Sequence, residues 1–384
     1  MELSKRVSTL PASGIRAMFT LAEKYENTIN LCIGEPGFIT PQHIIDAGCK
    51  AWNDGYTKYV SNPGMMVLRK AIAEKMNRDN GFDVKAENVI VTFGANQSLF
   101  SSMQVVLNPG DEILVPNPCF PNYFGYIALA QGKPVTVPTY EEDCFHIKAA
   151  VLEKYITPKT RAVIINSPCN PTGSVTPKED LVEIAELAKK HDLIVISDEP
   201  YEALLFGDNK HFSIGSLPGM FERTITVNSF SKTYAMTGWR IGYAVAPENV
   251  IKAMTLVQGS TTSNVTAAVQ LAAVAALEGD QSCVAEMNAE YLKCRDILVK
   301  GLNEIKGISC ITPEGAFYAF ANIKATGMSA KDVAIKLLDE VQVVTTPGDA
   351  FGPDGEGFLR FSFAASESDI REALSRIRKC LGTK

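Results

Sequence analysis

The sequence predicts an α/β protein, with a large domain built on a seven-stranded, mostly parallel sheet covered by helices, and a smaller α+β domain. Two observations lead to this prediction. Between about residues 88 and 247, short runs rich in Val and Ile alternate with helical stretches or longer connections. Several of these runs are almost continuously apolar, which is typical of strands that helices cover on both faces. After residue 280, long helical patterns mix with a few strand patterns.

The apolar runs form the predicted sheet, and the segments between them have helical patterns. The runs are 88–94, 112–116, 133–138, 161–168, 192–199, 224–230 and 240–246. The segment 176–191 is amphipathic, and we expect Thr176 and Glu179 to form a capping box at its start. Directly after the first run, Gly94 to Asn96 are expected to begin another helix, where backbone N–H groups face any nearby anion.

The pattern divides the chain into three predicted parts. Residues 1–45 are polar and interrupted by Pro and Gly, and we expect an N-terminal arm that packs on the small domain or reaches a partner subunit. Residues 46–280 form the large domain, and residues 281–384 form the small C-terminal domain. The small domain is expected to contain a long helix at 283–305 and antiparallel strands around a Pro-Glu-Gly turn within 307–323.

Composition and charge argue against several classes of protein. The formal net charge of −6 is spread over 384 residues without basic tracts, which disfavours a nucleic-acid surface. The apolar stretch 267–277 is shorter than the roughly 20 residues that span a bilayer, so we expect a buried helix. Nine scattered cysteines and four separated histidines suggest neither disulfides nor a metal site. The N-terminal residues do not look like a signal peptide, which favours the cytoplasm.

Polar and aromatic side chains follow five of the predicted strands, at the edge where such sheets bind ligands. Taken singly, Asp198 suits a helix cap, Asn170 a turn, and Phe120 a hydrophobic core. Together they predict a pocket for an aromatic, phosphorylated cofactor that carries an aldehyde. The residues at these strand ends are Gly94, Ala95, Asn96, Phe120, Asn170, Asp198, Tyr201, Ser229, Ser231 and Lys232.

Three motifs in this region, SPCNPTG, SDEPY and SFSKTYAMTGWRIGY, resemble the signature of a known family. In this order and spacing they are similar to the class I/II aminotransferases of the fold-type I pyridoxal-phosphate-dependent family, and in particular to prokaryotic aspartate and aromatic aminotransferases. The resemblance covers nearly the whole chain. INLCIGEPGFITPQHI, KYVSNPGMMVLRKAIA and GFLRFSFA resemble the N-terminal segment, the loop and helix that follow it, and the C-terminal arginine strand of the family.

The resemblance implies a catalytic role for three residues. Lys232 would hold pyridoxal 5′-phosphate as a Schiff base and then move the substrate's Cα proton, because burial and neighbouring charges lower the pKa of a lysine. Asp198 would pair with the pyridine nitrogen and keep it protonated. Tyr201, together with Asn170, would hydrogen-bond the ring oxygen of the cofactor.

The resemblance also implies how the rest of the cofactor is held. Phe120, where many relatives have Tyr, would stack on the ring. The phosphate would be bound by a helix N-terminus, hydroxyl groups and a guanidinium, supplied by Gly94, Ala95, Asn96, Ser229, Ser231 and Arg240. Tyr59 resembles a tyrosine that reaches the phosphate from the neighbouring subunit. The resemblance therefore implies a homodimer with shared active sites.

Arg360 lies in an otherwise apolar strand, where an unpaired charge is unfavourable. One explanation is a salt bridge within the small domain. The resemblance implies a different partner, the α-carboxylate of the substrate, bound with the help of Asn170 and the backbone N–H of Gly34. Because Arg360 lies in the small domain and the cofactor would lie in the large one, we expect the two domains to close when the substrate binds.

The function implied by the resemblance is transamination, in which an L-amino acid gives its amino group to the cofactor and a 2-oxo acid then takes it in a ping-pong cycle. We expect an aspartate-like donor and 2-oxoglutarate as acceptor. The alternatives are a C–S β-lyase and an aromatic or alanine-type aminotransferase, while a non-catalytic effector sensor is disfavoured. The substrate side chain would contact either a second cation or an apolar wall, with Arg16, Lys58, Phe19, Phe38 and Ile39 as candidates.

Overall fold

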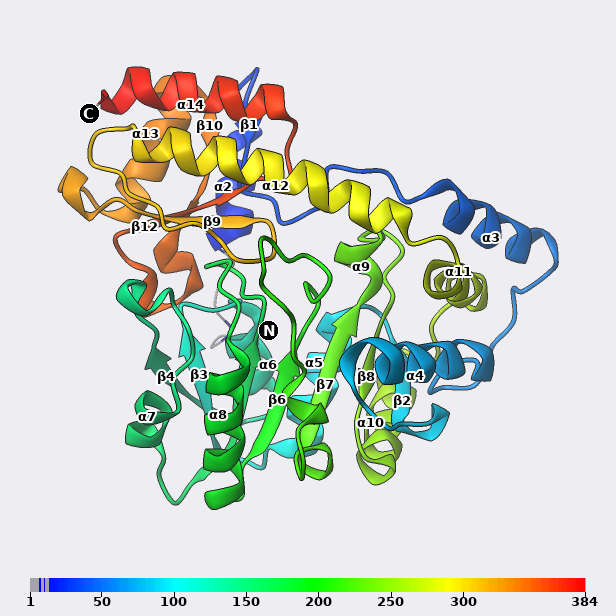
Figure 1. The fold of residues 1–384 in the computed structure, drawn as a ribbon. Helices are drawn as coiled ribbons and strands as arrows, with labels where there is room; N and C mark the ends of the chain where they lie inside the picture. Colours follow the sequence, from blue (N-terminus) through cyan, green and yellow to red (C-terminus); the bar gives the residue numbers. More distant parts are fainter. Residues whose placement is uncertain (1–6, 8–9, 11–13, 384) are drawn as a thin grey trace, which may run out of the picture.

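The structure is a computed structural model, and it describes residues 7, 10 and 14–383. Its main element is a seven-stranded sheet with the strand order β2-β8-β7-β6-β5-β3-β4 (Figure 1). The strands are β2 (Val89–Thr92), β3 (Glu112–Asn117), β4 (Lys133–Pro138), β5 (Thr160–Asn166), β6 (Ile194–Asp198), β7 (Thr224–Ser229) and β8 (Gly242–Val245). Each strand coincides with one of the apolar runs in the sequence, so the predicted sheet is confirmed.

Most neighbouring strands of this sheet are parallel. Strand β8 is the exception, because it runs antiparallel to both β2 and β7. The predicted run at 240–246 is shortened to Gly242–Val245, since Arg240 has a positive φ of 55° and lies before the strand. The sheet is therefore mostly parallel, as the sequence predicts.

Helices cover both faces of the sheet. Ile90, Ile164 and Ile196 point to one face, where they pack with α5 (Ala95–Val106), α6 (Asn122–Leu129) and α10 (Glu248–Thr261). The other face packs with α4 (Met66–Asn80), α7 (Ala149–Leu152), α8 (Lys178–Lys190) and α11 (Ala267–Glu278). Helix α11 is the buried helix expected at 267–277, and α3 (Gln42–Asn53) packs against it.

The predicted capping box of α8 is wrong. The helix begins at Lys178 with Pro177 in the N-cap position, and no side chain caps it. Thr176 lies one residue too early and is buried, and its backbone N–H donates to Oγ of Ser167 at 2.9 Å. Glu179 and Asp180 place negative charge in the first turn, which stabilises the helix dipole instead.

A second, antiparallel sheet has the order β11-β12-β9. Its strands are β9 (Tyr318–Asn322), β11 (Thr346–Pro347) and β12 (Phe358–Ser362), and apolar residues join them to α12 (Ser282–Asn303), α13 (Ala330–Val341) and α14 (Glu367–Leu381). The long helix expected at 283–305 is confirmed as α12, which runs above both sheets in Figure 1.

The antiparallel strand pair expected within 307–323 does not form around the Pro-Glu-Gly turn. Strand β9 pairs with β12, and Ser309 makes an isolated bridge to Asn322. The turn packs on another loop instead, because the N–H groups of Glu314 and Gly315 both donate to the carbonyl oxygen of Gly173 at 2.9 Å.

The described part of the N-terminal segment packs beside the second sheet. Strand β1 (Ile29–Asn30) pairs in parallel with β10 (Val343–Val344), and α2 (Gly14–Ala22) contacts β10 and β11. This arrangement is consistent with the expected arm, while the domain boundaries at 45 and 280 stay a prediction. None of the helices that the structure describes is long and apolar enough to cross a membrane.

Short 3-10 helices complete the described fold. They are η1 (Ala86–Asn88), η2 (Glu141–Asp143), η3 (Glu153–Tyr155), η4 (Ile214–Ser216), η5 (Phe221–Arg223), η6 (Lys324–Thr326), η7 (Gly348–Phe351) and η8 (Pro353–Gly355).

Candidate active site

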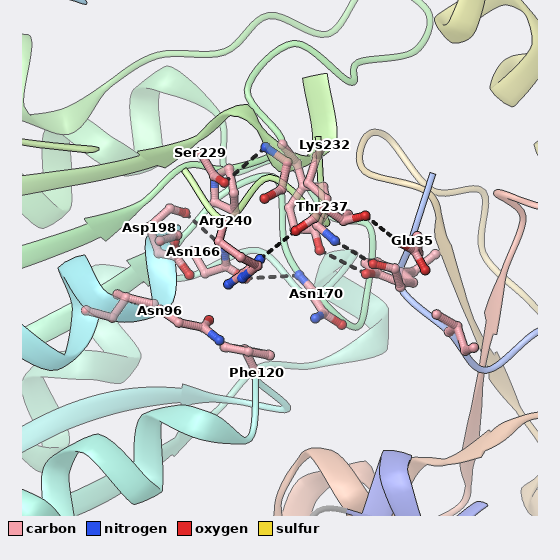
Figure 2. Close-up of a pocket in the computed structure, with 18 of the residues that line it drawn as sticks. Glu35, Asn96, Phe120, Asn166, Asn170, Asp198, Ser229, Lys232, Thr237 and Arg240 are labelled. Atoms are coloured by element: carbon pink, nitrogen blue, oxygen red, sulfur yellow. Dashed lines mark hydrogen bonds between the residues drawn. The ribbon is translucent and has the colours of Figure 1, made fainter. Parts of the chain in front are cut away.

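A pocket of about 360 Å³ lies where the carboxyl ends of β5, β6 and β7 meet the second sheet (Figure 2). It brings together nearly all residues that the sequence predicts for the site. Those that line it are Gly34, Ala95, Asn96, Phe120, Asn170, Asp198, Tyr201, Ser229, Ser231, Lys232, Arg240 and Arg360. Gly94 lies beside the pocket, next to Arg240, while Tyr59 does not line it.

One end of the pocket is suited to an anion. Gly94 is the N-cap of α5 and has a φ of 75°, a conformation that L side chains rarely adopt. A Cβ atom added there would lie 2.9 Å from Nη2 of Arg240, so glycine lets the guanidinium approach the helix N-terminus. Ser229 caps the short helix α9 (Phe230–Thr233) by accepting from the Ser231 N–H at 3.1 Å. Helix N–H groups, hydroxyls and a guanidinium together form an anion-binding cradle.

Lys232 lies on α9, is half-buried and lines the pocket. Its Nζ donates to the carbonyl oxygen of Gly34 at 2.5 Å. Burial lowers the pKa of Lys232 to about 8; Glu35 opposes the shift, and Arg360 and Arg240 add to it. A lysine with this pKa is partly neutral near physiological pH, so it can act as a nucleophile and as a base.

Asp198 ends β6 and is almost completely buried. Its Oδ2 accepts from the hydroxyl of Tyr123 on α6 at 2.6 Å, whereas Oδ1 has no hydrogen-bond partner among the described residues. Burial raises the pKa of Asp198 to about 7, the hydrogen bond from Tyr123 lowers it, and the charge of Glu199 raises it. The free oxygen is therefore able to accept a hydrogen bond from a protonated ligand nitrogen.

Two tyrosine hydroxyl groups lie close together in the pocket. Oη of Tyr201 lies 2.8 Å from Oη of Tyr318 on β9, and burial raises the pKa of both phenols. The ring of Tyr318 also lies 4.4 Å from the guanidinium carbon of Arg360. Both phenols stay protonated and can donate hydrogen bonds.

Arg360 on β12 is buried, with 1% of its surface exposed. Its Nη1 donates to Oδ1 of Asn170 at 2.8 Å and its Nη2 to the carbonyl oxygen of Cys32 at 2.5 Å. Among the described residues, no carboxylate pairs with this guanidinium, and Nε has no partner. The salt bridge considered as the alternative is therefore not formed within the described chain, and a buried cation is left without an anion.

Several pocket residues were not predicted from the sequence. Asn166 donates to the backbone oxygen of Asp198 at 2.9 Å and accepts from the Asn170 N–H at 3.0 Å, so it holds the two strand ends together. Tyr318 lines the pocket, and Tyr123 contacts Asp198 without lining it; both are buried aromatic residues that nothing in their local sequence distinguishes from core residues. The other unpredicted lining residues are Ile33, Glu35, Leu99, Pro200 and Thr237.

The proposed contacts to the substrate side chain do not lie in the pocket. Arg16, Lys58, Phe19, Phe38 and Ile39 are all exposed in the single chain and do not line it. Ile33, Leu99 and Phe120 supply the apolar wall that the described chain presents instead.

Sequence and structure comparisons identify the family. The profile of "Aminotransferase class I and II" matches residues 26–377. This chain belongs to the class I and II aminotransferases. An aspartate aminotransferase of Pyrococcus abyssi is 46% identical and an aromatic-amino-acid aminotransferase of Thermococcus litoralis 45% identical, each match covering 100% of this chain and 99% of the relative.

Solved structures of aminotransferases have the same fold. The aspartate aminotransferase of Thermus thermophilus with maleate superimposes with a TM-score of 0.95 and 38% sequence identity. The match covers 99% of this chain and 100% of that one. The aminotransferase described here is therefore a pyridoxal-phosphate-dependent enzyme with the fold-type I architecture.

The pocket of this aminotransferase fits pyridoxal 5′-phosphate on three independent observations. Lys232 presents an amine of lowered pKa for the aldehyde. The unpaired Oδ1 of buried Asp198 suits a protonated ring nitrogen. The N-terminus of α5, with Ser229, Ser231 and Arg240, forms a cradle for the phosphate.

Proposed function

We propose that this aminotransferase transfers the amino group of an aspartate-like L-amino acid to 2-oxoglutarate by a ping-pong mechanism. The observation that supports this proposal most strongly is Arg360, a buried guanidinium that lacks an acidic partner and lines the same pocket as Lys232. An α-carboxylate satisfies this cation and places the rest of the substrate beside the lysine.

The chain's own groups have distinct tasks in the proposed reaction. When bound, pyridoxal phosphate withdraws electrons from the substrate's Cα and so makes its proton acidic. Lys232 accepts that proton at Nζ and later returns it, which its pKa of about 8 permits near neutral pH. Asp198, when ionised, balances positive charge at the ring nitrogen, and Tyr201 and Asn170 orient the ring oxygen.

The remaining lining residues hold the ligands in place. Phe120 packs on the ring, and the α5 N-terminus with Gly94, Ala95 and Asn96 binds the phosphate together with Ser229, Ser231 and Arg240. Arg360, Asn170 and the Gly34 backbone bind the substrate carboxylate. Closure of the pocket over bound ligands would exclude water and strengthen each of these electrostatic contacts.

Aspartate is our first candidate donor, because relatives from Pyrococcus abyssi and Thermus thermophilus are named aspartate aminotransferases. Aromatic amino acids are the second candidate. The cationic side chains that line the pocket in the described chain are Lys232, Arg240 and Arg360, and each already has a proposed task. The wall formed by Ile33 and Leu99 is apolar and suits an uncharged side chain.

We also propose that the enzyme is a cytoplasmic homodimer with shared active sites. In the single chain, Tyr59 is 90% exposed, which is unusual for a large aromatic residue unless it contacts a partner. A contact between Tyr59 and the phosphate site of a second copy is consistent with that exposure.

A panel of L-amino acids tested against 2-oxoglutarate distinguishes these candidates. Aspartate-dependent formation of glutamate, lost in Lys232→Ala, supports the main proposal, and a preference for phenylalanine or tyrosine supports the second. Release of pyruvate and ammonia from cysteine-type substrates without an added oxo acid would instead identify a C–S β-lyase. A purified wild type that stays colourless with pyridoxal phosphate would contradict all three.

A further inference from the structure

The segment that carries Asp198 and Tyr201 has a second, buried side. Asp198 and Tyr201 line the cofactor pocket, whereas Glu199 and Glu202 do not. Glu202 instead lines a separate cavity of about 430 Å³, together with Lys75 and His211. Ser229 lines both cavities, so they lie on two sides of the same part of the molecule.

Glu199 is a buried carboxylate with three hydrogen-bond donors. Its side chain is 1% exposed. The hydroxyls of Ser197 and Ser213 each donate to it at 2.6 Å, and Nε2 of His211 lies 2.8 Å from its Oε2. A hydrogen-bonded acidic group is therefore held one residue from Asp198, and its charge raises the pKa of the Asp198 carboxyl group.

Glu202 is held by a different cation. Nζ of Lys75 on α4 hydrogen-bonds Oε1 of Glu202, and Nδ2 of Asn80 donates to Oε2 at 2.6 Å. The ligand atoms of Glu199, Glu202 and His211 lie within 4.8 Å of one another, which is close enough to suggest a metal site. Lys75 already supplies a positive charge there, so the geometry favours a network of ion pairs.

His211 is placed to compensate the charge of Glu199. Its side chain is 9% exposed and its Nδ1 has no partner among the described residues. Burial opposes a charge on the imidazole, but the charge and hydrogen bond of Glu199 and the charge of Glu202 outweigh it and raise the pKa of His211. Folding therefore favours the imidazolium form of His211 relative to a free imidazole.

We propose that Glu199 and His211 form a positioning pair. The pair holds the Asp198 segment on the side away from the cofactor pocket and keeps the Asp198 carboxylate ionised for the cofactor. The proposal rests on the proposed function, because it assigns Asp198 to the ring nitrogen. A protonated His211, 2.8 Å from Oε2 of Glu199, opposes the field that Glu199 exerts on Asp198. Without that opposing charge, Glu199 disfavours a second negative charge next to it.

The groups that set these charges can be named. Around His211, the charged and titratable groups are Glu199, Glu202, Lys75, Asp79, Tyr234 and Tyr243. Around Asp198, they are Tyr123, Glu199, Tyr126, Cys169 and Tyr201, with Lys232 and Arg240 across the pocket. His211 is the histidine among these groups, and it does not line the cofactor pocket.

Two substitutions of the pair have opposite predicted effects. His211→Gln leaves Glu199 uncompensated and raises the pKa of Asp198, while Glu199→Gln removes the repelling charge and lowers it. The probe is pyridoxamine 5′-phosphate, whose binding needs the ring-nitrogen contact but not a neutral Lys232. Its affinity for the apoprotein is measured by equilibrium dialysis between pH 5.5 and about 9. The pH at which pyridoxamine phosphate binding is half-maximal is expected to rise by about 1 unit in His211→Gln and to fall in Glu199→Gln.

A matched control separates charge from packing. His146 and Glu314 form another His–Glu contact of 2.8 Å outside the cofactor pocket, and His146→Gln is expected to leave the half-maximal pH unchanged. A shift in the same direction for both variants of the pair, or no shift in either, overturns the proposal. Wild-type protein that binds no pyridoxamine phosphate at all contradicts the proposed function instead.

A second measurement does not depend on the variants folding. The chain has four histidines, so their imidazole proton signals can be assigned and titrated by NMR in the wild-type protein. The His211 signal is expected to titrate above 6.5, the ordinary value, and to shift further when pyridoxamine phosphate binds. A His211 that is already neutral at pH 6 would contradict the pair.

Discussion

Nη1 of Arg360 lies 2.8 Å from Oδ1 of Asn170, and this hydrogen bond connects the small antiparallel sheet to a loop of the large one. The two residues are 190 positions apart in the chain. Asn170 is neutral, so the contact orients the guanidinium without neutralising it. The positive charge stays available for a ligand at the junction of the two sheets.

We expect Arg360→Lys to weaken substrate binding while leaving the cofactor bound. The ammonium group of a lysine cannot make the bidentate hydrogen bonds that a guanidinium makes with a carboxylate. Loss of one charged hydrogen bond of about 1.5–3 kcal/mol raises KM for the amino donor by roughly 10- to 150-fold. Steady-state kinetics and the absorbance of bound pyridoxal phosphate measure the two effects separately.

Arg295→Lys is the control for that substitution. Arg295 on α12 is also largely buried and donates to the carbonyl oxygen of Pro313 at 3.1 Å, but it does not line the pocket. The KM of the Arg295→Lys variant for the amino donor is expected to match that of the wild type. An unchanged KM in Arg360→Lys would show that Arg360 does not bind the carboxylate.

Lys232 should capture pyridoxal phosphate faster as the pH rises. The pKa of about 8 means that the amine is mostly protonated at pH 7 and mostly neutral at pH 9. Since only the neutral amine attacks an aldehyde, the initial rate of capture by the apoprotein is expected to rise through a midpoint near 8. Stopped-flow absorbance measures this rate, and a midpoint near 10.5 would indicate an unperturbed lysine.

The apoprotein of Asp198→Asn is expected to be more stable than the wild-type apoprotein. The folded-state pKa of about 7 lies above the ordinary 3.8, so ionised Asp198 destabilises the folded state by about 4 kcal/mol at most. The difference in unfolding free energy should grow between about pH 4 and 7 and then level off. Urea unfolding at several pH values measures it.

The same substitution should weaken cofactor binding, because Asn cannot balance the charge of a protonated ring nitrogen. Stability and cofactor affinity therefore change in opposite directions. If Asp198→Asn instead destabilised the apoprotein at pH 8, then Asp198 would have a structural role that its unpaired Oδ1 does not suggest.

Gly94→Ala is expected to reduce cofactor affinity by displacing Arg240. The new Cβ would lie 2.9 Å from Nη2, and a flexible guanidinium can move away from it. We expect about a tenfold higher Kd for pyridoxal phosphate, together with a loss of roughly 1 kcal/mol in stability from the positive φ.

Gly110→Ala supplies the matched control, since Gly110 has a φ of 89° and no neighbouring atom within 4 Å of an added Cβ. It should lose similar stability without any change in Kd. Equal effects of both substitutions on Kd would mean that Arg240 and the α5 N-terminus do not bind the phosphate.

Much of the fold could be predicted because the strands are buried on both faces. Strand β5 contains the apolar run 162–165 and β6 begins with the apolar run 194–196, and the polar residue Asp198 marks where β6 ends. Parallel strands place these ends together, so local sequence was enough to assemble most of the pocket.

The rest depended on contacts between distant segments. Tyr123 and Tyr318 have the local pattern of core residues, and only the fold brings their hydroxyls to Asp198 and Tyr201. The Pro-Glu-Gly turn has the composition of a hairpin, but its backbone N–H groups donate to the carbonyl oxygen of Gly173, and β9 pairs with the distant strand β12. The proposed role of Tyr59 needs a second copy of the chain, which a single sequence does not place.

The most direct test of this account is to locate the lysine that binds pyridoxal phosphate. The purified protein is incubated with pyridoxal phosphate, reduced with sodium borohydride, digested and mapped by mass spectrometry. We expect a phosphopyridoxyl group on Lys232, and no label at this peptide in Lys232→Ala. A label on another lysine, with Lys232 unmodified, would contradict it.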